Sequence, residues 1–231
     1  TLDVDGGTIK LDGNYPVGSE NVALGGNTLD DGSLTGGNNT AIGTAALTVN
    51  TSGSSNVAVG RYTMVANTTG SSNTALGREA LSSNDTGVEN VAIGREAMDN
   101  NTSGGKNVAV GLHALLSNTT ASNNTAVGYQ AGYSNTTGGS NTAVGYQALT
   151  NSTTPSDNTA LGFQALKSNT TATNNTATGM RALENNTTGA SNTALGREAL
   201  KYNTTASNNT AVGYQAGYST TTGSYSTSVG Y

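Results

Sequence analysis

One short segment recurs along almost the whole chain at a fixed spacing. It reads Asn-Thr-Ala-Val-Gly at residues 124–128, and its glycine occurs thirteen times. From the second glycine onward the copies follow one another at a constant 17-residue interval, and the first interval is longer by a single position. The glycines are Gly25, Gly43, Gly60, Gly77, Gly94, Gly111, Gly128, Gly145, Gly162, Gly179, Gly196, Gly213 and Gly230. A fixed period of this length over many copies indicates a solenoid, in which each repeat forms one coil and stacks on the next.

We number each repeat from position one to position seventeen, starting at the asparagine of this segment. Position two is valine or threonine, position three is alanine, and position four is valine, isoleucine or leucine with few exceptions. β-Branched residues at alternate positions predict a strand of about five residues. Side chains alternate between the two faces of a strand. We therefore expect positions two and four to point into the coil. Positions one, three and five would then form a flat Ala/Gly surface that a neighbouring chain can approach closely.

The remainder of each repeat is too short for a helix. Position nine is usually leucine, and it follows the glycine of position five by only four positions. We expect a second short strand or an irregular segment whose leucine fills the core. Positions twelve to fifteen read Asn-Thr-Thr-Gly or a close variant, as at residues 135–138, which predicts an outer turn. Stacked coils place identical residues in ladders, and asparagine amides in a ladder can bond to their copies. At about 4.8 Å per coil, the stack predicts a rod about 60 Å long.

The repeat divides the chain into two parts. Residues 1–20 lie outside the period and contain two short alternating segments, at 1–5 and 8–12, separated by glycines. We expect this lead-in to cap the first coil, because an open coil exposes a strand edge. Residues 21–231 then form about thirteen repeats, the last of them truncated. The predicted fold class is all-β, a parallel β-solenoid with one 17-residue coil per repeat.

The composition argues against several classes of function. Hydrophobic residues make up 33% of the chain and aromatic residues 5%, so the core must be thin. The chain has no cysteine, and an acidic pI near 4.6 argues against a nucleic-acid partner. No apolar run is long enough to insert in a membrane. His113 is the only histidine, and no insertion interrupts the repeats to build a cleft. We expect no catalytic residue, no metal, no cofactor and no enzymatic activity.

Aromatic side chains are the most distinctive candidates for contact with a partner. Four of them share position six: Tyr129, Tyr146, Phe163 and Tyr214. Tyr133 and Tyr218 share position ten. Such rows can cover the junction between chains, or they can stack on sugar rings. The chain also contains Asn-x-Thr sequons, for example at Asn67, Asn118, Asn135 and Asn169. We interpret these as part of the turn ladder and not as glycosylation sites.

The repeat resembles two known groups of proteins. The segment at residues 90–94, Asn-Val-Ala-Ile-Gly, resembles the head repeat of YadA-like trimeric autotransporter adhesins. The longer unit from residue 141, Asn-Thr-Ala-Val-Gly-Tyr-Gln-Ala-Leu, resembles the repeats of phage tail-fibre proteins. The resemblance covers residues 21–231, although the adhesin repeat is shorter than the repeat of this chain. It implies a left-handed parallel β-roll, a side-by-side homotrimer, and an extracellular location on a virion or a bacterial cell surface.

The leading hypothesis is a non-enzymatic structural shaft of a phage tail fibre or bacterial surface adhesin, which projects from the surface or contributes to attachment. Its partner would be itself. One alternative is a side wall that binds cell-surface glycans through the tyrosine rows. A second is a subunit of an extracellular filament whose chains join end to end. A third is ice binding by stacked threonines, among them Thr51, Thr68, Thr119 and Thr136.

Overall fold

The computed structural model describes residues 20–230, and the expected cap at residues 1–20 lies outside them except for Glu20. In this part of the chain each repeat forms one short strand, shorter than expected. The strands are β1 (Val22–Leu24), β2 (Thr40–Ile42), β3 (Val57–Val59), β4 (Thr74–Leu76), β5 (Val91–Ile93), β6 (Val108–Val110), β7 (Thr125–Val127), β8 (Thr142–Val144), β9 (Thr159–Leu161), β10 (Thr176–Thr178), β11 (Thr193–Leu195), β12 (Thr210–Val212) and β13 (Thr227–Val229).

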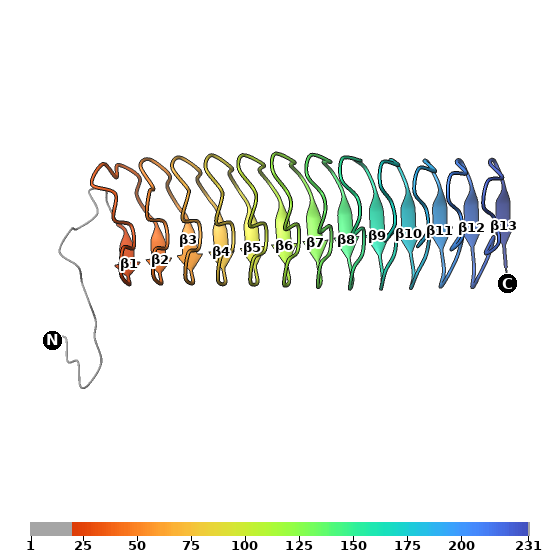
Figure 1. The fold of residues 1–231 in the computed structure, drawn as a ribbon, viewed down its shortest axis with the longest axis horizontal. Helices are drawn as coiled ribbons and strands as arrows, with labels where there is room; N and C mark the ends of the chain where they lie inside the picture. Colours follow the sequence, from red (N-terminus) through yellow and green to blue (C-terminus); the bar gives the residue numbers. More distant parts are fainter. Residues whose placement is uncertain (1–19, 231) are drawn as a thin grey trace, which may run out of the picture.

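These strands form one 13-stranded parallel sheet in the order of the sequence. The register is that of the repeat: Thr125 pairs with Thr142, and Ala126 pairs with Ala143. Backbone hydrogen bonds continue past the strand ends, with the Gly128 amide donating to the Val110 carbonyl at 2.8 Å. The coils therefore stack into a straight rod with the sheet along its whole length (Figure 1). The prediction of an all-β parallel β-solenoid with a 17-residue period is confirmed.

The rest of each coil consists of turns and bends, so the irregular segment is found and the second strand is not, within the described coils. Three positions per coil repeatedly adopt a left-handed backbone, as at Ser140, Gln147 and Leu149 with φ of 57°, 53° and 53°. These residues reverse the chain direction and close the coil within a single repeat. The glycine at position five also has a positive φ, for example 134° at Gly128. A Cβ atom there would lie 2.4 Å from the Gly145 carbonyl oxygen of the next coil.

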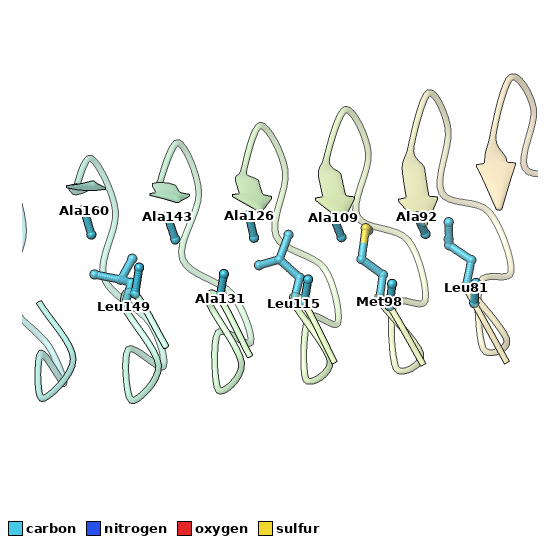
Figure 2. Close-up of a cluster of buried hydrophobic side chains, with 14 of the residues drawn as sticks. Leu81, Ala92, Met98, Ala109, Leu115, Ala126, Ala131, Ala143, Leu149 and Ala160 are labelled. Carbon is cyan, nitrogen blue, oxygen red and sulfur yellow. The ribbon is translucent and has the colours of Figure 1, made fainter. Parts of the chain in front are cut away.

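The expected orientation of the strands is wrong. Position three is the buried position, with Ala126 1% and Ala143 2% exposed, whereas positions two and four point outward. Figure 2 shows the reason: the strand alanines point across a narrow interior toward the leucine or methionine of position nine. The space between the sheet and the opposite wall admits only a methyl group from the strand. The alternation was predicted correctly, but the inner and outer faces were exchanged.

The core is a single stack of small and large side chains. Position eight supplies alanine, and position nine supplies the large member, such as Leu149, Leu166 and Met98, each at most 1% exposed. The expectation that the position-nine leucine fills the core is confirmed. In the coil of β7, position nine is Gly132. The wall opposite the sheet therefore contributes only Ala131 to the core between Leu115 and Leu149 (Figure 2).

Two internal asparagine ladders run beside this apolar stack. At position one, Asn56 Oδ1 accepts a hydrogen bond from the backbone N–H of Asn73 at 3.0 Å, and Asn56 Nδ2 donates to the Gly70 carbonyl at 2.8 Å. At position twelve, Asn67 donates to Asn50 Oδ1 at 2.9 Å and to the same Gly70 carbonyl at 3.0 Å. The two ladders thus share one acceptor per coil. Buried amides need such partners, so the ladders fix the stacking of the coils.

Candidate interaction surface

The outer face of the sheet is the surface that the fold leaves open. We define it by two columns of side chains, one from position two and one from position four of β1–β13. Column two holds Val22, Thr40, Val57, Thr74, Val91, Val108, Thr125, Thr142, Thr159, Thr176, Thr193, Thr210 and Thr227. Column four holds Leu24, Ile42, Val59, Leu76, Ile93, Val110, Val127, Val144, Leu161, Thr178, Leu195, Val212 and Val229.

The outer face is largely apolar and carries no charged residue in either column. Its larger side chains are substantially exposed: Leu76 is 45%, Leu161 41% and Leu195 48% exposed. Single exposed apolar residues are ordinary, but a contiguous strip of them marks an interaction surface. The strip arises because the narrow interior accepts only alanine, so every large strand side chain must point outward.

The two columns differ in polarity along the rod. From β1 to β6 column two is mainly valine, and from β7 to β13 it is threonine on every strand. The hydroxyls of these seven threonines make no hydrogen bond with another described residue of the chain. They are therefore available to water or to a partner. The position-thirteen threonines differ, since Thr119 Oγ1 donates to the Thr136 carbonyl at 3.1 Å and Thr136 Oγ1 donates to the Thr153 carbonyl at 3.0 Å.

The aromatic residues of position six form a second ladder beside this face. The Tyr129 and Tyr146 rings lie 5.1 Å apart with an interplanar angle of 17°, and the Tyr146 and Phe163 rings lie 5.2 Å apart at 9°. The guanidinium of Arg181 lies 5.8 Å from the Phe163 ring centroid, and that of Arg197 lies 5.5 Å from the Tyr214 centroid. Because the middle ring of the stack is covered on both sides, it presents its edge to the solvent, and a sugar cannot stack on its faces.

The two position-ten tyrosines lie apart from this ladder. Tyr133 contacts His113 edge-on, with centroids 6.1 Å apart, and Tyr218 contacts Tyr202 edge-on at 4.9 Å. A side-chain hydrogen bond with Tyr202 raises the pKa of Tyr218. The six aromatic residues singled out from the sequence therefore belong to separate groups. The structure stacks only Tyr129, Tyr146 and Phe163 on one another.

The charged side chains form short surface networks. Arg95 lies 2.7 Å from Glu96 Oε1, and His113 Nε2 lies 2.9 Å from Glu96 Oε2. The hydrogen bond from Arg95 lowers the pKa of Glu96. Burial raises the pKa of Asp99, and its hydrogen bond with Ser82 acts in the opposite direction. In residues 20–230 no group of three His, Cys, Asp or Glu side chains is placed to hold a metal ion. Nor does that part of the chain contain a helix long and apolar enough to cross a membrane.

The sequons at position twelve lie inside the rod. The side chains of Asn67, Asn118, Asn135 and Asn169 are at most 2% exposed. Asn118 Nδ2 donates to Asn101 Oδ1 at 2.7 Å and to the Ala121 carbonyl at 3.1 Å, so the amide is used within the ladder. The interpretation of these residues as turn ladders is confirmed, and their amides are closed to modification in the folded chain.

Sequence reasoning missed the outer face, although one signal for it was present. Position three is alanine in twelve of the thirteen repeats, and only a tightly enclosed site restricts residue size in this way. Position four, in contrast, varies among valine, isoleucine, leucine and threonine, as an open surface allows. Neither the family models, nor the curated proteins, nor the solved structures gave a match to the chain.

Proposed function

We propose that the chain is a non-enzymatic structural shaft, belonging to a phage tail fibre or a bacterial surface adhesin, that works outside the cell as a side-by-side homotrimer of left-handed coils. The observation that carries the proposal is the uncharged, largely apolar outer face, which extends over all thirteen strands. The motif resemblance at residues 90–94 and from residue 141 supports the assignment to fibres and adhesins.

A rod of this construction suits a mechanical role. Most coils repeat the core and the asparagine bonds of the coil before them, with exceptions such as Gly132 in the core and Ser152 in the position-twelve ladder, so stiffness comes from repetition. Both ladders and the sheet add hydrogen bonds along the rod axis, as from the Asn73 amide to Asn56 Oδ1. Among the described coils, none has a constellation of residues that the others lack and that could perform a reaction.

The outer face suits a second copy of the same chain. Its two columns carry no charge, so copies at the same level bring no like charges together there. The strand portion measures about 60 Å by about 10 Å, or about 600 Å². A typical stable interface buries roughly 800 Å² per partner, and the position-six column beside the face contributes aromatic residues but also Arg61, Arg78, Arg95 and Arg197. In this proposal the interface is the Val/Leu/Ile/Thr face, because the alanine of the face expected from the sequence lies inside the coil.

The test is the mass of the particle in solution, measured by light scattering after size-exclusion chromatography. A homotrimer has about three times the chain mass of 23.0 kDa. Ile93→Glu places a charge in the outer face and should dissociate the particle. The matched control is Ser103→Glu, which adds the same charge at an exposed turn position. A wild-type monomer would rule out the homotrimer, and an open-ended mass distribution would favour an end-to-end filament.

A further inference from the structure

The outer face also contains a feature that can set the register between copies. In β7–β13 the column-two residue of every strand, here called a rung, is threonine. Moving one copy along its neighbour by one rung therefore leaves the facing column-two residues unchanged within that run. Column four is the only place where the rungs of this half differ in polarity. There, six strands present valine or leucine and β10 alone presents a polar residue, Thr178.

Thr178 lies where its hydroxyl is not satisfied within the described chain. It is the third residue of β10, and its side chain is half-buried on the outer face. The hydroxyl makes no hydrogen bond with another described residue. Its neighbours in the column are Leu161 on β9 and Leu195 on β11, which offer no donor or acceptor from their side chains.

We propose that Thr178 fixes the register of the C-terminal half of the side-by-side assembly, an inference that rests on the proposed function. When copies align rung for rung, the Thr178 hydroxyls lie at the same level and bond to one another. When one copy slips by a rung, each Thr178 faces Leu161 or Leu195 of a neighbour, and its hydroxyl is buried without a partner. A single polar residue in an apolar seam sets the register of coiled coils by the same physics.

Val-to-Thr changes in column two add to this selection in the N-terminal half, where valine and threonine alternate from β1 to β5, and again at the middle of the rod. A slip by one rung brings Thr125 of β7 against Val108 of β6, while the remaining threonines of the C-terminal half still face threonines. Thr178 therefore marks the register in the C-terminal half, and the Val/Thr steps of column two mark it in the N-terminal half and in the middle of the rod.

Cysteine cross-linking measures the register directly, because the chain has no cysteine of its own. Differently tagged chains with Val127→Cys and Val144→Cys are refolded together and oxidised. Bonds between equal positions report aligned copies, and bonds between 127 and 144 report a slip of one rung, because a disulfide requires close Cα atoms. The pair is compared in the native background and in the backgrounds Thr178→Val, Thr178→Ser and Thr171→Val.

With Thr178→Val we expect the 127–144 product to increase roughly tenfold relative to the aligned products. This is the factor expected when the cost of one unmatched hydroxyl is removed. Thr178→Ser keeps the hydroxyl and should keep the native ratio of the 127–144 product to the aligned products. Thr171→Val should also keep it, because the exposed hydroxyl that it removes does not lie on the outer face. An unchanged ratio in Thr178→Val, with the oligomer intact, would overturn the register role and leave the proposed function standing. Absence of every cross-link, or a monomeric mass, would overturn the outer-face interface itself and the register role with it.

Discussion

Replacing Asn107 by leucine tests whether the internal ladders hold the coils together. Asn107 Nδ2 donates to Asn90 Oδ1 at 3.1 Å and to the Ala121 carbonyl at 2.8 Å, and its Oδ1 accepts from the Asn124 amide at 2.9 Å. Leucine has a similar shape but none of these groups. Asn90 Oδ1 keeps the Asn107 backbone amide, at 3.0 Å, and the Ala121 carbonyl keeps its second donor. Only the Asn124 amide is left buried without a partner.

The expected loss of stability follows from this count. One orphaned buried donor costs about 1–3 kcal/mol, and the bonds lost to groups that keep another partner add about 1 kcal/mol more. We therefore expect Asn107→Leu to lower the free energy of unfolding by about 2–4 kcal/mol. With a denaturant slope of about 2–3 kcal/mol per molar urea, the unfolding midpoint falls by about 1 M. Far-UV circular dichroism at one fixed protein concentration measures it, with Asn100→Leu on the exposed side of a neighbouring coil as the control.

The shared acceptor makes a stricter test possible. Asn118 Nδ2 also donates to the Ala121 carbonyl, at 3.1 Å. Either single replacement leaves that carbonyl one donor, whereas Asn107→Leu combined with Asn118→Leu leaves it none. The double variant should lose about 1–3 kcal/mol more than the sum of the single variants. Additive single effects, within about 0.5 kcal/mol, would refute the argument that the two ladders are coupled through one carbonyl.

Three further predictions concern single coils, each measured by urea unfolding. Gly128→Ala should lower stability by at least about 3 kcal/mol, because a Cβ atom there meets the Gly145 carbonyl and the φ of 134° disfavours any side chain; an effect as small as that of an exposed Ala substitution would contradict this. Leu166→Ala should cost about 3–5 kcal/mol, since stacked neighbours above and below limit collapse into the cavity; a loss under about 1 kcal/mol would mean that the core is loosely packed. Asp99→Asn should stabilise the rod near neutral pH. The raised pKa of Asp99 means that the folded state binds the proton more tightly, so the penalty from its charge develops as pH rises above the ordinary carboxyl value. The gain should disappear in acid, where both states are protonated, and a gain independent of pH would show that the charge is not its cause.

Local sequence information specified most of the architecture. The 17-residue interval determined the number and stacking of the coils, because a repeat that cannot bury its own apolar side chains must bury them against the next copy. The leucine of position nine, as at Leu149, was correctly placed in the core. Asparagine in the repeat was correctly assigned to ladders, since an amide carries both a donor and an acceptor that identical copies can exchange.

Which side of the strand faces the core was decided only by the tertiary structure. A strand that alternates valine, alanine and leucine has two faces, and hydrophobicity alone favours burying the larger residues. The closed coil reverses this preference, because left-handed corners such as Gln147 and Leu149 bring the opposite wall so near that only Ala143 fits between. The same distance sends Thr142 and Val144 outward, and so creates the surface through which we propose that copies associate. The distance across the coil depends on atoms far apart in the repeat, and for that reason the period could predict the stack but not its inner face.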